Sequence, residues 1–465
     1  MCGHVKWWMI LSAGVLIGCH AFALYILPSL ELGTWSHRNW GFHFWQFYPE
    51  WMAVGAYALA CLAVIPHINQ AGFQGAMRCI PSRLLYWLRR HKWMGFVGGS
   101  ILSWVIFWVF RQKYGFLGDG YLRASDLAIG QVPLAEMGTL YMMLGLNWVV
   151  KAWGGNEVLS MQVFSTFWGG LYVFLVCVWS DWLGRFFDEK VLVGGCLIFI
   201  GAIQFFFGYI EVYAPMPVFL LGFALTSCLF LDKKLSIWWP TLAVGVGVWM
   251  HILMAASIPA LAYLWYEHLR FRYMWLRQIR PYLIWGAGGI GVVGMIVVPR
   301  TVPLSVPWLP FFSTAESPFA VFTWVHLWEW ANAQILGSPI VWPLLVVCCV
   351  VTTRRRLRQD LGGIVLILVA AVHLYGSLVF GFPMGSKDWD LQSFSGLALV
   401  VLVTYWICRT SRESISPALR QYLMVCAVCF AALNTVPWVW INYTDQSIDR
   451  IAEAITADPA LYFNS

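Results

Sequence analysis

The residues that could do chemistry stand in a few short polar segments between long apolar stretches. In the first of these segments, Asp119, Arg123 and Asp126 are spaced at i, i+4 and i+7. This spacing places the three side chains on one face of a helix that Asp119 caps and Gly130 ends. Two carboxylates beside an arginine could accept a proton and bind an anion, or they could form only a helix cap and a surface ion pair.

Two further polar segments interrupt apolar sequence. One contains Glu211 and Tyr213, and an acidic residue in such a place is costly unless it faces a wet cavity. The other contains Lys387, Asp388 and Asp390. Asp388 and Asp390 have the Asp-x-Asp spacing of carboxylates that hold a divalent metal ion such as Mg²⁺ or Mn²⁺. These two residues are therefore candidate metal ligands, and the sequence indicates no other cofactor.

His251 stands alone at the predicted turn between two short apolar stretches. Its imidazole could pack as a neutral, hydrogen-bonded core group, or it could contact a ligand. The sequence leaves both interpretations open.

The composition identifies the solvent that surrounds these segments. Of the 465 residues, 60% are hydrophobic and 11% are charged, and 30 are Trp. Soluble domains contain about 45–50% apolar and about 25% charged residues. A soluble globular fold is therefore excluded, and the chain is expected to lie in a membrane, with Trp side chains at the headgroup level.

Windows of about 19 residues predict an all-α polytopic membrane protein of about 13 transmembrane helices. The predicted spans are 7–27, 51–66, 93–110, 158–180, 190–207, 213–231, 236–250, 251–266, 281–299, 338–352, 361–380, 391–408 and 419–440. One further apolar stretch, 134–153, is expected to lie along the outer interface as an amphipathic helix, since the next span must run inward.

Lys and Arg set the predicted orientation. On one side of the membrane lie 21 of the 29, in alternate loops: Lys6, Arg78, Arg83, Arg89, Arg90, Lys92, Arg185, Lys190, Lys233, Lys234, Arg270, Arg272, Arg277, Arg280, Arg354, Arg355, Arg356, Arg358, Arg409, Arg412 and Arg420. The positive-inside rule then makes the N-terminus cytoplasmic and the C-terminus external, in a cell (cytoplasmic or inner) membrane. Because these charges are dispersed among short loops, the net charge of +7 does not indicate a nucleic-acid partner.

The order of these segments resembles the GT-C superfamily of polytopic, lipid-phosphosugar-dependent glycosyltransferases, which includes protein mannosyltransferases and aminoarabinose transferases. The resemblance runs from Met94 to Thr410. It is carried by these short segments: Gly118-Asp119-Gly120-Tyr121, Pro133-Leu134, 207–213 and 387–391. Protein mannosyltransferases have Asp-Glu in the first outer loop, whereas Gly120 follows Asp119 here. Two predicted spans also precede the usual first helix.

The resemblance implies three parts of the chain. Residues 1–92 hold the two additional N-terminal helices and an aromatic outer loop, 93–410 form a GT-C-like catalytic core, and 411–465 hold the last span and a short acidic outer tail. The implied activity moves a sugar from a polyprenyl-phosphate donor to a lipid, glycan or protein acceptor at the outer face.

The resemblance also implies roles for the polar residues. Asp119 is the expected catalytic base, and the remaining candidates bind substrate: Arg123, Asp126, Glu211, Tyr213, His251, Arg300, Lys387, Asp388 and Asp390. Among the cations, Arg123, Arg300 and Lys387 are expected to meet the donor phosphate. The acidic side chains Glu211, Asp388 and Asp390 could bind sugar hydroxyls or a divalent metal ion.

Two other functions stay open. A proton-coupled secondary transporter would use intramembrane carboxylates as a proton relay, although no inverted repeat is visible and the carboxylates collect at outer helix ends. A non-catalytic membrane protein of envelope assembly would leave the outer clustering of acidic residues unexplained.

Overall fold

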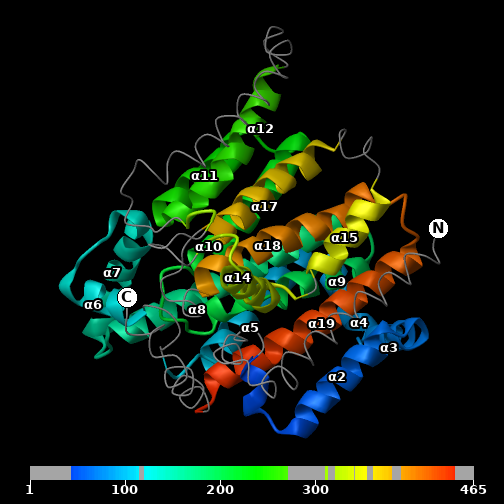
Figure 1. The fold of residues 1–465 in the computed structure, drawn as a ribbon, viewed down its shortest axis with the longest axis horizontal. Coiled ribbons are helices and arrows are strands. Elements are labelled where there is room, and N and C mark those ends of the chain that lie inside the picture. The colour runs from blue at the N-terminus through cyan, green and yellow to red at the C-terminus, as the bar shows by residue number, and fades with distance from the viewer. Residues whose placement is uncertain are drawn as a thin grey trace.

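A computed structural model describes residues 43–114, 120–270, 309–312, 320–339, 341–352, 360–379 and 389–445 of the chain. Every regular element in these ranges is helical, and most of the long helices run side by side in one bundle (Figure 1). The predicted all-helical class is thus confirmed for the part of the chain that the structure describes.

The α-helices are α2 (Glu50–Val64), α3 (Pro66–Arg78), α4 (Ser82–Arg90), α5 (Lys92–Val109), α6 (Gly120–Ile129), α7 (Met137–Ala152), α8 (Glu157–Leu183), α9 (Phe187–Ile198), α10 (Pro215–Leu231), α11 (Trp238–Met250), α12 (Ile258–Arg270), α14 (Trp324–Gly337), α15 (Val341–Val351), α17 (Leu361–Val379), α18 (Trp389–Tyr405) and α19 (Pro417–Tyr443). Short 3-10 helices are η4 (His43–Phe47), η5 (Leu134–Glu136), η6 (Gly201–Phe206) and η7 (Ile252–Ser257), and η9 (Trp406–Thr410) is a π-helical turn.

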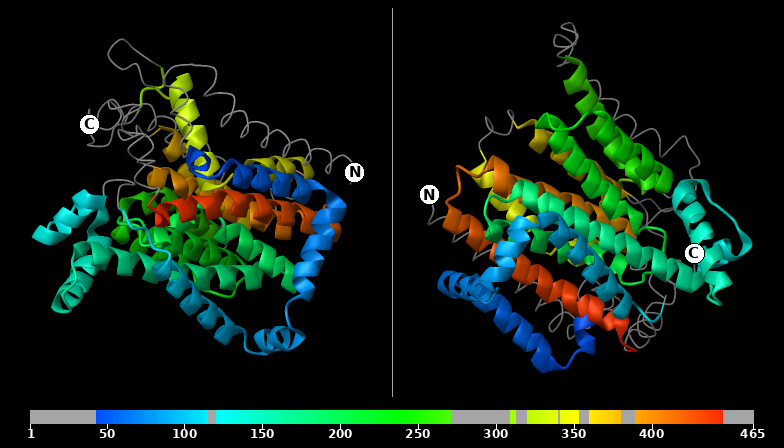
Figure 2. Two further views of the ribbon diagram at one scale, coloured as in Figure 1. Left: turned by 90° about the horizontal axis from the view of Figure 1, so that it is seen from below. Right: turned by 180° about the vertical axis from the view of Figure 1, so that it is seen from behind.

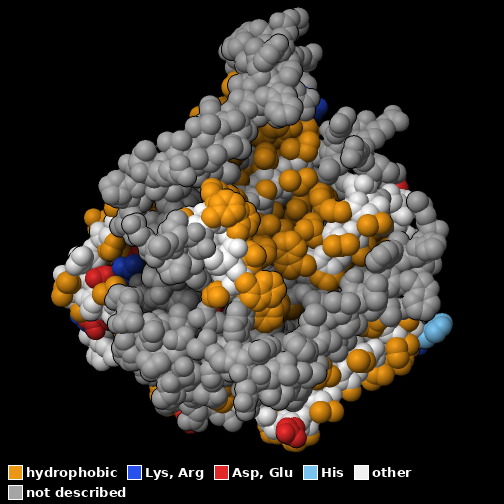
Figure 3. Space-filling model, viewed as in Figure 1, with side chains coloured by type: hydrophobic (Ala, Val, Ile, Leu, Met, Phe, Trp, Pro, Cys, Tyr) orange, Lys and Arg blue, Asp and Glu red, His pale blue; other side chains and the backbone are white. Residues whose placement is uncertain are grey.

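In the described part of the chain, five helices are long and apolar enough to cross a membrane: α5, α8, α17, α18 continued by η9, and α19. The number rises to eight if each of three bent helix pairs counts as one span. The surface of helix α5 is apolar and suits contact with lipid. Ile101, Leu102 and Val105 are exposed on it, and Phe107 is its one buried residue. Hydrophobic side chains also make up most of the described surface in Figure 3, with charged groups near its rim.

The predicted span 51–66 matches α2, and α3 follows it at an angle of 99°. Ile65 is extended there because it precedes Pro66, which starts α3. The span 190–207 is divided into α9 and η6, and a Cβ atom on Gly201 would lie 2.2 Å from the carbonyl oxygen of Leu336. The chain leaves the helix where glycine permits this close approach.

One further span requires correction. The stretch 251–266 consists of η7 and α12 rather than one helix, whereas the predicted short stretch 236–250 matches α11, which has 13 residues. The predicted spans 7–27 and 281–299 lie outside the described residues, so the count of 13 stays a prediction.

The predicted outer elements before α8 are confirmed as helices. Helix α6 ends at Ile129, and Gly130 follows with φ of +74°, as the predicted stop requires. The amphipathic stretch 134–153 forms η5 and α7, which are bent by 97° from α6. Together, α6 and α7 lie at one end of the molecule (Figures 1 and 2).

Helix α18 occupies the centre of the bundle. It packs against α10, α14, α15 and α17, and Leu391 is its one residue that is not buried. A helix that is apolar on all sides is expected in such a place. Its first turn positions Asp390, and its last turn leads into η9.

Candidate functional site

The segment 207–214, between η6 and α10, forms the centre of the candidate site. Gly208 has φ of +64°, and a Cβ atom there would lie 2.6 Å from Cβ of Arg111. Only glycine fits this conformation and this approach. The carbonyl of Phe207 accepts a 2.8 Å hydrogen bond from the backbone N–H of Gln112. The segment is thereby fixed to the chain that follows α5.

Tyr209 connects this segment to α18. Its hydroxyl donates a 2.9 Å hydrogen bond to Oδ2 of Asp390, whose Oδ1 accepts from the backbone N–H of Leu391 at 2.8 Å. Both side chains are buried. Burial first, then the carboxylates of Asp390 and Glu211, raise the pKa of Tyr209 well above its usual value. The phenol therefore stays protonated and acts as a donor.

Glu211 lies two residues further along the same segment and is also buried. Because its carboxylate and that of Asp390 both act on the Tyr209 hydroxyl, the two acidic groups belong to one electrostatic environment. Two of the predicted polar segments therefore meet, although they are far apart in the sequence.

Arg123 organises a second group of charges. Its Nη1 lies 3.1 Å from Oδ2 of Asp126, and its Nη2 lies 2.8 Å from Oε1 of Glu136. The arginine side chain is only 17% exposed, so these ion pairs are shielded from water. Arg123 thus forms an ion pair with Asp126, as one of the two open interpretations of this segment expected, but the pair is shielded rather than at the surface. The sequence interpretation missed Glu136, which the bend between α6 and α7 brings beside Arg123.

His251 joins these two groups. Its Nε2 lies 4.0 Å from Oε1 of Glu136, and its Nδ1 accepts a 3.2 Å hydrogen bond from the backbone N–H of Leu253. The ring of Tyr213 lies 5.0 Å from the imidazole. His251 is in the turn between α11 and η7, where burial first and then Arg123 lower its pKa to about 3. It is neutral at pH 7 and carries its proton on Nε2.

Close backbone packing holds these elements in place. A Cβ atom on Gly120 would lie 1.7 Å from the carbonyl oxygen of Ile210, so α6 begins in direct contact with the central segment. Helix α7 meets the end of α11, where the hydroxyl of Thr139 donates a 3.0 Å hydrogen bond to the carbonyl of Met250. A Cβ atom on Gly138 would also lie 2.7 Å from the carbonyl oxygen of Trp249.

The structure brings together six of the predicted site residues, and we call them, with Glu136 and Tyr209, the carboxylate cluster. Its members are Arg123, Asp126, Glu136, Tyr209, Glu211, Tyr213, His251 and Asp390. The other predicted residues, Asp119, Arg300, Lys387 and Asp388, lie outside the described residues. Tyr209 was missed, although its place two residues before Glu211 in a polar segment was a usable signal.

Among the described residues, no group of three His, Cys, Asp or Glu side chains could hold a metal ion. Asp390, one of the two candidate ligands, accepts hydrogen bonds on both carboxylate oxygens. Asp388, the other candidate ligand, lies outside the described residues, so the metal site stays a prediction.

The carboxylate cluster can bind an anionic or hydroxyl-bearing group. Arg123 supplies a permanent positive charge, neutral His251 supplies an N–H donor, and the buried carboxylates supply proton acceptors. In a site with little water, each of these interactions is stronger than it would be at an exposed surface.

Compared with protein-family models, curated proteins and solved structures, the chain has no match in any of the three.

Proposed function

We propose that the protein is a membrane glycosyltransferase that moves a sugar from a polyprenyl-phosphate donor to a lipid, glycan or protein acceptor at the outer face of a membrane. One observation carries the proposal. Largely shielded Arg123, held by Asp126 and Glu136, lies in the same cluster as His251 and Tyr213, at an end of an apolar helical bundle. A substrate with a charged headgroup and a lipid tail requires such a polar site next to hydrocarbon.

The departing phosphate needs a positive partner. A guanidinium binds phosphate oxygens through parallel N–H donors and stays charged at every relevant pH. The two carboxylates beside Arg123 hold its side chain in one orientation, which reduces the entropy lost when a substrate binds. Arg300 and Lys387 are proposed as further phosphate contacts.

The acceptor needs a base for its proton. We assign this role to Asp119, because it directly precedes Gly120, whose backbone touches Ile210 next to Glu211. Glu211, Asp388 and Asp390 are proposed to bind sugar hydroxyls, and Asp388 completes the late polar segment. Asp388 and Asp390 also stay candidate ligands of a divalent metal ion.

The experiment uses the full chain in liposomes with polyprenyl phosphates that carry radiolabelled hexoses or pentoses. Wild-type protein should release label from the lipid phase, to an added membrane extract or to water. Asp119→Asn should lower this rate by about 10²–10⁴, the usual effect of losing a general base. The matched control is Asp445→Asn, which removes an exposed carboxylate that contacts Lys113 and Tyr114. Equal rates for the two variants, or no release from any donor, would contradict the proposal.

Proton-coupled transport is the second candidate, and one observation favours it. Asp390 is a buried carboxylate in the first turn of the central helix α18, where transporters place proton-relay residues. Uptake of label into the liposomes under a proton gradient, without release from the lipid, would favour this function over glycosyl transfer.

A further inference from the structure

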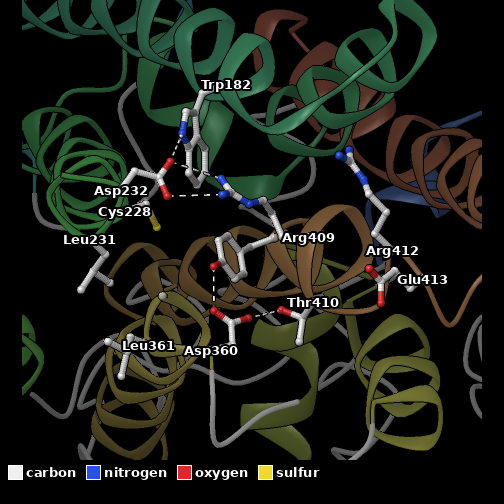
Figure 4. A pocket seen from close by; sticks show the side chains of 12 residues that line it. Trp182, Cys228, Leu231, Asp232, Asp360, Leu361, Arg409, Thr410, Arg412 and Glu413 are labelled. Carbon is white, nitrogen blue, oxygen red and sulfur yellow. Dashed lines mark hydrogen bonds and ion pairs between the residues drawn. The ribbon is translucent and has the colours of Figure 1, made fainter. Parts of the chain in front are cut away.

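A second polar site lies at the opposite end of α18 from Asp390. It is a cavity of about 620 Å³ between the ends of α8, α10, α17 and η9. The charged and hydrogen-bonding side chains that line it include Trp182, Asp232, Asp360, Tyr405, Arg409, Arg412 and Glu413 (Figure 4). A volume of this size is typical of small-molecule sites and large enough for a lipid headgroup.

The backbone at this cavity is unusual. The N–H of Ser411 donates a 2.8 Å hydrogen bond to the carbonyl of Trp406, five residues earlier, so η9 is a π-helical turn. Such turns are rare and often occur at functional sites. The turn presents Arg409 to the ring of Trp182, with 4.7 Å between the guanidinium carbon and the ring centre.

Two carboxylates at the centre of the cavity, those of Asp232 and Asp360, already accept hydrogen bonds from residues of the cavity wall. Asp232 accepts from Nε1 of Trp182 at 3.1 Å and from Nη2 of Arg409 at 3.3 Å. Asp360 accepts from the hydroxyls of Tyr405 and Thr410, and from the backbone N–H of Gly363. These carboxylates therefore have little need of a cationic ligand.

Donor capacity is left over on the arginines. Arg409 points its two terminal nitrogens at Asp232, which leaves the Nε edge of its planar guanidinium for a second bidentate partner. Its side chain is 36% exposed, so a ligand can reach it. Nε of Arg412, on the cavity rim, is buried and has no hydrogen-bond partner among the described residues, while Nη2 of Arg412 donates to Glu189 and to the carbonyl of Leu183. The donors that are left on the two arginines suit a ligand that is rich in acceptors.

The surroundings of the cavity add positive charge. Lys233 and Lys234 follow α10 directly, and Arg185 follows α8. Anionic phospholipids attract such basic helix ends, and pockets between spanning helices on the basic side of a membrane protein bind lipid phosphates. Trp182 beside the guanidinium suits the same headgroup level.

We propose that this cavity binds the phosphate of an anionic phospholipid headgroup, with the Nε edge of Arg409 as its main contact and Arg412 on the rim as a source of positive potential. The bound headgroup would connect the ends of α8, α10, α17 and η9. This site is separate from the carboxylate cluster and does not depend on the proposed glycosyl transfer.

The test measures lipid adducts on the purified full chain by native mass spectrometry. Phosphatidylglycerol should bind at least tenfold more tightly than phosphatidylcholine, and Arg409→Gln should weaken it by about 10–100-fold, as expected for a lost charge-assisted hydrogen bond. The matched control is Arg111→Gln. The guanidinium of Arg111 also stacks on a tryptophan, Trp108, at 4.3 Å, but it does not line the cavity.

A second variant protects the test against misfolding, because Arg409→Gln also removes a partner of Asp232. Leu231→Trp fills part of the cavity and leaves the Arg409 pair intact, so it should weaken phosphatidylglycerol binding as well. If inorganic phosphate competes at a concentration similar to that of the lipid, the site binds free phosphate, and the proposal that it binds a lipid headgroup is wrong. Equal losses in Arg409→Gln and Arg111→Gln, or unchanged binding in Leu231→Trp, would overturn the site itself.

Discussion

The hydroxyl of Tyr209 lies 2.9 Å from Oδ2 of Asp390, a residue 181 positions later in the chain. This hydrogen bond joins the segment after η6 to the first turn of the central helix α18. Its neighbours are aromatic, with the rings of Phe205 and Trp389 at 5.7 and 5.5 Å from the phenol ring. A charged acceptor in such apolar surroundings depends strongly on its donor.

Tyr209→Phe should therefore destabilise the protein by about 1.5–3 kcal/mol, the range for a hydrogen bond to a charged group. Tyr172→Phe is the control, because the Tyr172 hydroxyl donates to a neutral acceptor, the carbonyl of Leu197, at 2.8 Å. The control should lose only about 0.5–1.5 kcal/mol. Unfolding by denaturant in detergent micelles measures the loss of stability in both variants. Equal losses would contradict a stronger hydrogen bond to Asp390 than to a neutral carbonyl.

Local rules predicted the elements around the carboxylate cluster. Gly130 adopts the left-handed conformation that ends α6, and Pro133 directly precedes η5, as the residue types indicated. The pairing of Arg123 with Asp126 also follows from helical spacing. Contacts between elements were not predictable in this way. Glu136 reaches Arg123 through a bend of 97°, and no local pattern encodes that angle.

Two predicted spans, 190–207 and 251–266, were wrong for a different reason. A hydropathy window measures how much apolar sequence is present, but not whether one helix runs through it. The end of α2 before Pro66 had a clear signal, since the residue before a proline avoids helical geometry, and the predicted span 51–66 ends there. The break near Gly201 had none, because it depends on the carbonyl of Leu336, which is distant in sequence.

Arg123→Gln should be strongly destabilising, by about 3–5 kcal/mol, because it leaves the carboxylates of Asp126 and Glu136 buried without their arginine. Lys151→Gln is the control, since Lys151 pairs with Glu157 but its side chain is 47% exposed. The control should change stability very little. Thermal unfolding of both variants in the same detergent measures the difference, and a similar small effect in both would mean that water reaches the Arg123 pairs.

His251 should make the protein sensitive to mild acid. Its pKa is near 6.5 when unfolded and about 3 when folded, so below pH 6.5 the unfolded chain binds a proton that the folded chain rejects. Stability should therefore fall as the pH drops from 7 to 5, by up to about 1.4 kcal/mol per pH unit.

His251→Asn should remove this contribution, because an Asn oxygen can still accept from the Leu253 N–H but does not titrate. The measurement compares unfolding midpoints of the two proteins at pH 7 and pH 5. Glu136 and Arg123, which face the imidazole, are present in both proteins. Parallel losses of stability in the two proteins would rule out His251 as the titrating group.

The orientation of the bundle can be tested with two exposed residues, Ser125 in α6 and Lys234 after α10. In a background with Cys61, Cys79 and Cys349 replaced by Ser, a membrane-impermeant maleimide should label Ser125→Cys on intact cells. Lys234→Cys should be labelled only after the cells are permeabilised, since the basic loops are expected inside. Labelling of both positions from outside would contradict the positive-inside orientation.

Gly120→Ala should weaken the contact between α6 and the central segment of the site. The added Cβ atom would lie 1.7 Å from the carbonyl oxygen of Ile210. The Cβ atom is fixed to the backbone and the carbonyl oxygen is part of it, so neither can move away by a side-chain rotation. Overpacking of this kind typically costs about 1–3 kcal/mol. The control is Gly145→Ala in α7, where nothing lies within 4 Å of the added Cβ atom, and alanine should be neutral or stabilising.

The same pair of variants tests the proposed activity. The folded fraction of Gly120→Ala should transfer sugar more slowly than that of Gly145→Ala, because the displaced α6 carries Arg123 and directly follows Asp119. Equal stabilities and equal transfer rates would show that α6 does not need this contact to position the site.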